Sequence, residues 1–177
     1  MKKVKAICMA LLAIVAMASC RGPVGPQGPQ GPQGNANVAS STVTIRPSDW
    51  YWDNNTSWRV DIDYEAISQD ITDYGAVLVY MESSQNVWRQ IPFTFYYSQV
   101  INDQECFFSS SLEVSTYDNG VSIFWTESDF YDQYRPEEHR FKIVVIAANL
   151  YNSRTDVDYS NYEAVKKAFQ LEEKTAQ

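Results

Sequence analysis

The sequence predicts a mainly β domain, an antiparallel β-sandwich of about seven or eight strands with one short C-terminal helix. Apolar residues recur with a period of two, and turn-forming residues separate the apolar runs. All 25 aromatic residues lie between Trp50 and Phe169, so the core is expected to be rich in aromatic side chains. The chain has 177 residues, and residues 42–177 are enough for one such domain but not for two.

The first strands follow from the pattern of apolar residues. An opening strand is expected near residues 43–46. Over residues 58–66, apolar residues alternate with charged ones, which predicts a half-buried strand with one face in water. The segments 76–81 and 141–148 are apolar on both faces, which predicts two central strands.

The remaining strands are expected on either side of turn residues. A turn leads into residues 87–97, where Pro92 implies an edge strand or a bulge, because proline cannot donate a ladder hydrogen bond. The Asp-Asn-Gly sequence at 118–120 is a strong hairpin signal. It is expected to join a strand within 105–117 to a strand at 121–126.

One helix is expected over residues 161–170. Ser160 and Glu163 have the spacing of a capping box, in which a hydroxyl and a carboxylate satisfy the free N–H groups of the first turn. Apolar residues then follow at near-helical spacing, at Tyr162, Val165 and Phe169. We expect this helix to cover one edge or one open end of the sandwich.

Residues 1–19 are predicted to be a signal peptide. Lysines at positions 2, 3 and 5 precede the apolar run 6–18, whose 13 residues are too few to span a bilayer. Residues 17–20, Met-Ala-Ser-Cys, resemble the bacterial lipobox. The resemblance implies that the chain is cut before Cys20 and that Cys20 is acylated, which anchors the protein in a membrane. The alternative is simple secretion, with Cys20 incidental.

Residues 22–34 are expected to form a stalk. They hold five of the seven Gly and four of the seven Pro, as four Gly-X-Y triplets and a closing Gly. Gly at every third position is the period of collagen, but a single chain of this composition favours polyproline II and would reach about 40 Å. A semi-rigid, single-chain spacer is therefore expected, with a short trimeric collagen helix as the alternative. The lipid-anchor Cys, this stalk and a small polar linker occupy residues 20–41.

Charge and cysteine content narrow the function classes. Without the three lysines of the signal peptide, the chain has 11 basic and 22 acidic residues, a net charge of −11. This charge argues against nucleic acid as a partner and against electrostatic adhesion to anionic lipid.

Loss of Cys8 and acylation of Cys20 leave Cys106, so no intramolecular disulfide is expected. Cys106 lies beside bulky apolar residues and is expected to be a buried, inert thiol.

The candidate ligand-binding residues lie in the aromatic segment 49–58. They are Trp50, Tyr51, Trp52, Asp53 and Trp58. Aromatic faces stack on sugar rings while carboxylates and amides bind hydroxyl groups, so the segment suits a glycan. The alternative is that these rings close the end of the sandwich and belong to its core. The loop 129–134 is also aromatic and acidic, and it has the same two interpretations.

No metal, cofactor or catalytic residue is expected. The acidic residues that could contribute to a metal site are Asp61, Asp63 and Glu65 on one strand face, and the pair Asp156 and Asp158. No calcium-loop motif accompanies either group, so solvated, charged surfaces are expected. His139 is the only His, which excludes zinc sites with several His ligands. It lies in a charged segment and is expected to be exposed.

Three segments of the domain resemble a family of uncharacterised lipoproteins from Bacteroidota. These proteins combine a lipobox Cys, a few Gly-Pro-X triplets and a β-rich C-terminal domain. The similar segments are 73–80, 88–93 and 141–146. The resemblance implies a lipoprotein of the bacterial outer membrane, and it transfers no functional residue beyond Cys20.

Together these observations favour a non-enzymatic envelope lipoprotein that presents a β-sandwich on a short stalk and binds a glycan or a protein. The alternative is a structural component that trimerises through its collagen-like segment. The domain is expected to be a monomer, or a trimer if the stalk assembles. A periplasmic and a surface-facing position on the outer membrane are both left as alternatives.

Overall fold

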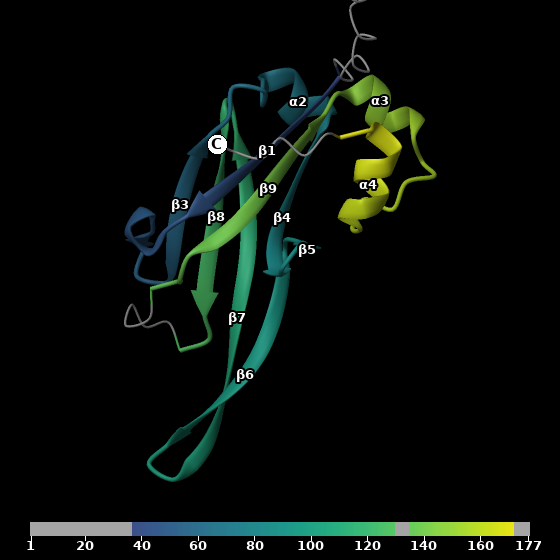
Figure 1. Ribbon diagram of the computed structural model, residues 1–177. Helices are drawn as coiled ribbons and strands as arrows, with labels where there is room; N and C mark the ends of the chain where they lie inside the picture. The colour runs from purple at the N-terminus through teal and green to yellow at the C-terminus, as the bar shows by residue number, and fades with distance from the viewer. Residues whose placement is uncertain (1–36, 130–134, 172–177) are drawn as a thin grey trace, which may run out of the picture. The chain divides into compact units, whose positions relative to one another are not determined.

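Two antiparallel sheets pack face to face in the computed structural model, which describes residues 37–129 and 135–171 (Figure 1). The four-stranded sheet has the order β1-β9-β4-β5, and the five-stranded sheet has the order β2-β3-β8-β7-β6. The strands are β1 (Val38–Ile45), β2 (Tyr51–Asp53), β3 (Ser57–Asp63), β4 (Ala76–Ser84), β5 (Val87–Gln90), β6 (Phe93–Ile101), β7 (Gln104–Tyr117), β8 (Gly120–Glu127) and β9 (His139–Ile146). The predicted β-sandwich is confirmed.

The strand count over the described residues is nine, because one predicted strand is two and the short strand β2 was not predicted. The segment 87–97 is interrupted at Pro92, where the chain leaves β5 of the four-stranded sheet and begins β6 of the five-stranded sheet. Both β5 and β6 are edge strands, as the proline implied. Just before Pro92, Ile91 is buried and its N–H donates to the carbonyl of Val79 at 2.9 Å.

The sandwich begins earlier than the sequence indicated. β1 is paired with β9 along its whole length, from Val38 opposite Ile146 to Ile45 opposite His139. Ala39 and Val43 pack against the core between the sheets. Residues 38–41 therefore belong to the sandwich and not to the linker. The small and polar residues in this segment show no clear apolar alternation, so the sequence did not predict the start of β1. Pairing with β9 defines this part of the strand.

The four-stranded sheet is buried on both faces, which explains the apolar runs in β4 and β9. Alternate residues of these strands, such as Val79 and Ile143, face the five-stranded sheet. The residues between them, such as Leu78 and Val144, face the C-terminal helix α4 (Tyr162–Phe169). The predicted helix thus covers a face of the sheet. The expectation that it would cover an edge or an open end was wrong, because two-sided apolar strands need a second cover.

The helix cap also differs from the sequence-based assignment. The N-cap of α4 is Asn161, whose side-chain oxygen accepts from the backbone N–H groups of Glu163 at 3.0 Å and Ala164 at 3.3 Å. The Ser160 hydroxyl instead donates to Asp158 at 2.6 Å. The N-cap was therefore predicted one residue too early, at the first of two consecutive polar residues, Ser160 and Asn161. With Asn161 at the N-cap, the third helical residue is Ala164, which has no polar side chain, so the predicted capping box does not form.

Two further helices and one 3-10 turn were not predicted. They are α2 (Gln69–Tyr74), α3 (Ala148–Ser153) and η1 (Pro47–Asp49). Each has at most six residues, too short for a helical apolar period to show in the sequence. After α2, Gly75 allows a close approach, because a Cβ there would lie 2.6 Å from the carbonyl oxygen of Ile146. None of the helices in the described part of the chain is long and apolar enough to cross a membrane.

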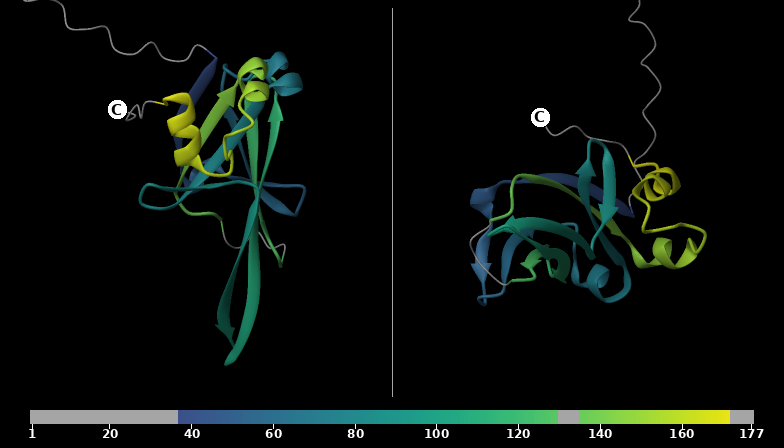
Figure 2. Two further views of the ribbon diagram at one scale, coloured as in Figure 1. Left: turned by 90° about the vertical axis from the view of Figure 1, so that its right-hand side faces the viewer. Right: turned by 90° about the horizontal axis from the view of Figure 1, so that it is seen from below.

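The hairpin formed by β6 and β7 extends well beyond the other strands (Figures 1 and 2). β8 pairs only with Ser110–Tyr117 of β7, whereas β6 pairs with β7 as far as Ile101 and Gln104. Asn102 and Asp103 form the tip, both with positive φ. We call residues 96–108 the arm.

Candidate functional site

Two of the candidate glycan-binding residues are core residues. Trp50 is 2% exposed and Trp58 is 5% exposed. The Trp50 ring meets the rings of Trp125 and Phe141 edge to face, each at 6.3 Å between centroids. Trp50 and Trp58 therefore cannot stack on a ligand at the surface, and their assignment to a glycan site is corrected. They fill the core, as in the alternative interpretation.

The other three candidates lie nearer to the surface. Trp52 is half-buried and packs on Trp58 at 5.3 Å between ring centroids. Tyr51 is exposed and Asp53 is half-buried. Tyr51 lies directly opposite Arg59 in the β2–β3 ladder, so both side chains share the outer face of the five-stranded sheet.

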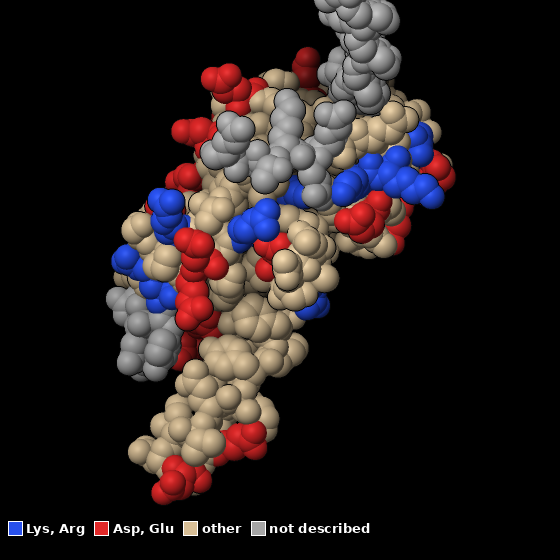
Figure 3. Space-filling model, in the orientation of Figure 1, with Lys and Arg blue, Asp and Glu red and all other residues tan. Residues whose placement is uncertain are grey.

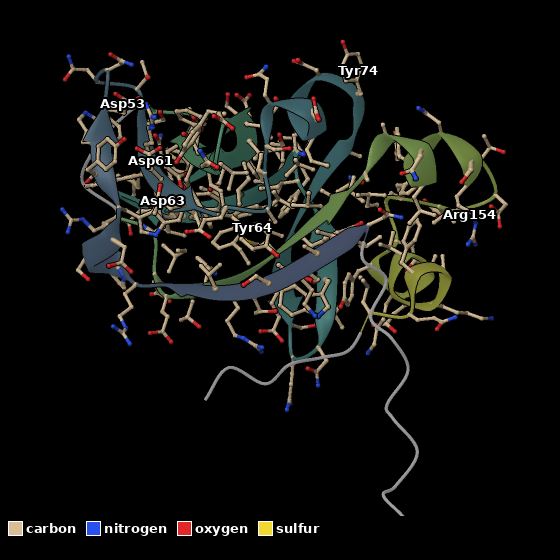
Figure 4. The ribbon with its side chains drawn as sticks, turned by 90° about the horizontal axis from the view of Figure 1, so that it is seen from above. Asp53, Asp61, Asp63, Tyr64, Tyr74 and Arg154 are labelled. Atoms are coloured by element: carbon tan, nitrogen blue, oxygen red, sulfur yellow. The ribbon has the colours of Figure 1, made fainter. Side chains whose placement is uncertain are left out.

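Arg59 organises the acidic residues of this outer face. Its guanidinium donates to Asp61 at 2.9 Å and lies 3.6 Å from Asp53. Asp61 also accepts from the hydroxyl groups of Tyr51 at 2.7 Å and Ser122 at 2.6 Å. Figure 4 shows Asp53, Asp61 and Asp63 on neighbouring strands at one side of the sheet, far from Arg154.

This network accounts for the shifted pKa values on the outer face. Burial raises the pKa of Asp61, but hydrogen bonds from Ser122, Tyr51 and Arg59 outweigh it, so the net pKa is lowered. Burial and the hydrogen bond to Asp61 raise the pKa of Tyr51 to about 12. A carboxylate already satisfied by a guanidinium and two hydroxyls is a poor calcium ligand. Among the described residues, no group of three His, Cys, Asp or Glu side chains could hold a metal ion.

His139 is half-buried, and the expectation that it would be exposed was wrong. Its ring stacks on Trp125 at 5.0 Å between centroids, with an angle of 20° between the planes. Burial lowers the pKa of His139, with Glu137 acting in the opposite direction. The charged neighbours of His139 in the sequence suggested an exposed side chain. Alternate positions of β9 point to opposite faces of the sheet, however, so a neighbour can be exposed where His139 is half-buried.

The remaining sequence-based candidates are accounted for by local contacts. Asp156 pairs with Arg154 at 3.0 Å, and Asp158 accepts from Ser160. Cys106 has a free thiol and is half-buried, where full burial was expected. Of the loop 129–134, only Asp129 lies within the described residues. Cys20 and the stalk, residues 22–34, also lie outside them.

The arm exposes large apolar side chains on its outer face. Tyr96 is 82% exposed, Val100 is 74% exposed and Phe107 is 78% exposed. Ser98 lies opposite Phe107, and the strand alternation puts Tyr96, Ser98 and Val100 on one face. Figure 3 shows the arm as a mostly uncharged surface with acidic residues near its tip. Sequence reasoning missed this surface.

The opposite face of the arm is an aromatic row that runs into the core. Phe95 meets the core residue Trp125 edge to face at 5.6 Å, and Tyr97 follows Phe95 at 6.4 Å between centroids. Beyond them, Tyr97 stacks on Phe108 at 5.7 Å. The arm is thus a continuation of the core side of the sheet into solvent.

One buried carboxylate joins the arm to the sandwich. Glu127, at the end of β8, is 8% exposed. It accepts from the indole N–H of Trp125 at 2.6 Å, from the Ser110 hydroxyl at 2.8 Å and from the Tyr97 hydroxyl at 2.8 Å. Burial and the bond to Glu127 raise the pKa of Tyr97 to about 12, so its hydroxyl remains a donor at physiological pH. The carboxylate therefore ties together β6, β7 and β8.

A sequence signal for the arm was present. Residues 93–101 read Phe-Thr-Phe-Tyr-Tyr-Ser-Gln-Val-Ile, which contains no charged residue. A strand of this composition at the edge of a sheet lacks the charges that usually protect an edge from pairing with another strand.

Comparison with models of known protein families, with curated proteins and with solved structures found no match.

We predict that Trp50→Ala lowers the free energy of unfolding by about 3–5 kcal/mol, because it leaves a large cavity between the sheets. Tyr51→Ala is the matched control, since it removes the adjacent ring from an exposed site and one hydrogen bond, which costs about 1 kcal/mol. Chemical denaturation of both variants measures the difference. Equal losses would contradict the assignment of Trp50 to the core.

We also predict that Glu127→Gln lowers the free energy of unfolding by about 1–3 kcal/mol. The amide group presents N–H donors to Trp125, Ser110 and Tyr97, which are all donors to the carboxylate. Hydrogen exchange of the arm backbone should accelerate at the same time. Glu113→Gln, at an exposed position of β7, is the control and should leave both measurements unchanged. Unaltered stability of Glu127→Gln would refute a structural role for the carboxylate.

Proposed function

We propose that this protein is a non-enzymatic lipoprotein of the bacterial envelope that presents its sandwich, and above all the arm, to a protein ligand. Acylated Cys20 anchors the chain in the outer membrane, and residues 22–34 hold the domain away from the anchor. The observation that carries the proposal is the exposure of Tyr96, Val100 and Phe107 on a ribbon that projects into solvent.

The energetics of the arm support a binding role. A two-stranded ribbon is marginally stable in water when no further strand or helix supports it. The arm nevertheless exposes three large apolar side chains on one face, where polar residues would hold a ribbon in solution equally well. Contiguous apolar surface of this kind marks interaction sites. Tyr, Phe and Val are also well suited to a protein interface, because few rotatable side-chain bonds are immobilised on binding.

A protein ligand is favoured over a glycan. Burial of Trp50 and Trp58 leaves Tyr51 and Trp52 as the accessible rings of the aromatic segment. The hydroxyl of Tyr51 is already bound to Asp61, and Asp61 is already paired with Arg59. The polar groups that would recognise sugar hydroxyls are therefore occupied within the protein, whereas the outer face of the arm offers exposed apolar side chains.

A structural role through the stalk is the second candidate. Gly at every third position of residues 22–34 is the observation that favours it, because only Gly fits at the axis of a collagen triple helix. Loss of oligomers on deletion of residues 22–34 would support that role. Oligomers that persist without those residues would count against it.

We predict that Cys20→Ser releases the protein from the membrane fraction, because Cys20 is the acylation site in this proposal. The mutant should appear as a soluble protein or as an uncleaved precursor, without incorporated fatty acid. Metabolic labelling with a palmitate analogue, followed by fractionation, measures both effects. Cys106→Ser provides the control and should remain in the membrane. A Cys20→Ser protein that is still labelled and membrane-bound would disprove the anchor.

We predict that the arm contacts another protein chain in living cells. A photoreactive benzoylphenylalanine at position 96 or 107 of the full-length protein should give covalent adducts of higher mass after irradiation. Tyr74, which is 68% exposed on α2, is the control position for random collisions and should give none. Adducts at position 74 alone, or no adducts at any position, would contradict a binding role for the arm.

A further inference from the structure

The outer edge of β6 lacks the features that keep edge strands apart. It is the last strand of the five-stranded sheet, and no other strand of the described residues pairs with its outer side. Natural edge strands are usually protected by a charged residue, a proline or a bulge. Pro92 lies just before β6, and all nine residues from Phe93 to Ile101 are uncharged. The edge is therefore open to pairing with another strand.

We propose that a second copy of this chain covers the edge, through antiparallel pairing of β6 with β6 of that copy. This inference rests on the proposed function, because it names the protein that the arm contacts. A twofold axis perpendicular to the sheet, passing midway between Ser98 and Ser98 of the second copy, relates the two strands. The resulting dimer replaces the monomer that the sequence alone suggested for the domain, and it joins two five-stranded sheets into one continuous sheet.

The register follows from the side chains that are exposed. A twofold axis perpendicular to the sheet keeps outer-face residues opposite outer-face residues. Centring it on Ser98 places Tyr96 opposite Val100 of the second copy, and Phe95 opposite Ile101. Aromatic residues opposite β-branched residues are favourable cross-strand pairs. Only this register brings Tyr96 against Val100, the two exposed apolar side chains of the outer face of β6.

Charge at the two ends of the interface supports a second copy as the occupant. The acidic residues of the hairpin, Asp103 and Glu105, lie at its tip. Antiparallel pairing separates the two acidic tips and brings each one to the base of the other arm. There Asp103 falls opposite Phe93, whose ring carries the guanidinium of Arg89 at 4.3 Å. Asp103 of each copy thus lies near Arg89 of the other, so one pair of opposite charges forms at each end of the interface, despite the net negative charge of the chain.

Anchoring would further favour this pairing. Chains tethered to one membrane by acylated Cys20 share a thin layer, which raises their effective concentration. A weak β6–β6 contact can therefore pair a large fraction of the membrane-bound molecules, even where only a small fraction pairs in dilute solution. For this reason the test uses the full-length, membrane-bound protein.

Disulfide trapping at position 98 tests the pairing and its register. In the full-length Cys106→Ser background, Ser98→Cys places one thiol beside the twofold axis, directly opposite the thiol of the second copy. Opposed residues in antiparallel strands have Cα atoms about 4.5–5.5 Å apart, within the range for a disulfide. Membranes treated with a mild oxidant should then contain mostly covalent dimers on non-reducing gels. Thr94→Cys, on the same strand, and Tyr74→Cys, on α2, are controls that should give several-fold less.

A charge exchange at the two ends of the interface provides a second test. Asp103→Arg in the Ser98→Cys protein should reduce the dimer yield several-fold, because it brings a second positive charge close to Arg89 at both ends. Adding Arg89→Asp should restore the yield, because positions 89 and 103 then carry opposite charges again at each end. Circular dichroism of each variant confirms that the domain is folded. A yield that is unaffected by Asp103→Arg, or that the second change fails to restore, would overturn the proposed register.

The results separate this inference from the proposed function. Photo-adducts of positions 96 and 107 with a different protein, together with no disulfide at position 98, would overturn the second copy and leave the protein-binding role intact. Equal disulfide yields at positions 74, 94 and 98 would also overturn the pairing, because they would indicate random collisions. The absence of both adducts and disulfides would overturn both proposals.

Discussion

The carboxylate of Glu127 is the interaction on which the arm depends. It lies at the end of β8, where the sheet narrows from three strands to the two strands of the hairpin. Its three donors come from β6, β7 and β8, so it holds the base of the ribbon in the plane of the sheet. A buried carboxylate is tolerated only when its oxygens are satisfied, and here Trp125, Ser110 and Tyr97 satisfy them. The same Trp125 ring packs in the core, which links the arm to the centre of the protein.

The two sheets have different surroundings, and this difference positions the arm. The four-stranded sheet is covered by the five-stranded sheet on one face and by α4 on the other. The outer face of the five-stranded sheet carries instead a polar network around Arg59 and Asp61. Its edge strand β6 begins at the sheet crossover after Pro92 and continues past the end of the sandwich. The strand that continues past the sandwich, β6, is also one that exposes large apolar side chains, namely Tyr96, Val100 and Ile101.

The proposed roles of the parts are compatible with one another. A lipid anchor at Cys20 and a stalk over residues 22–34 would set the distance of the sandwich from the membrane. Pairing between copies through β6 would then link neighbouring molecules side by side, without requiring a pocket or a catalytic group. An interface made from backbone ladders and a few large side chains needs an uncharged strand edge that is open to pairing. The arm supplies such an edge.

The sequence by itself determined the β-sandwich, the two central strands, the 118–120 hairpin and the C-terminal helix. Each of these depends on periodicity or on local turn chemistry, which neighbouring residues express directly. Only the tertiary structure decided that Trp50 is core while Tyr51 is surface, that α4 covers a face of the sheet, and that residues 38–41 form a strand. It also decided that β6 outruns its neighbours and exposes Tyr96. These features depend on which strands pair and where each ladder ends. Such long-range contacts are not determined by a local pattern, and for the arm the chain shows only the uncharged run 93–101.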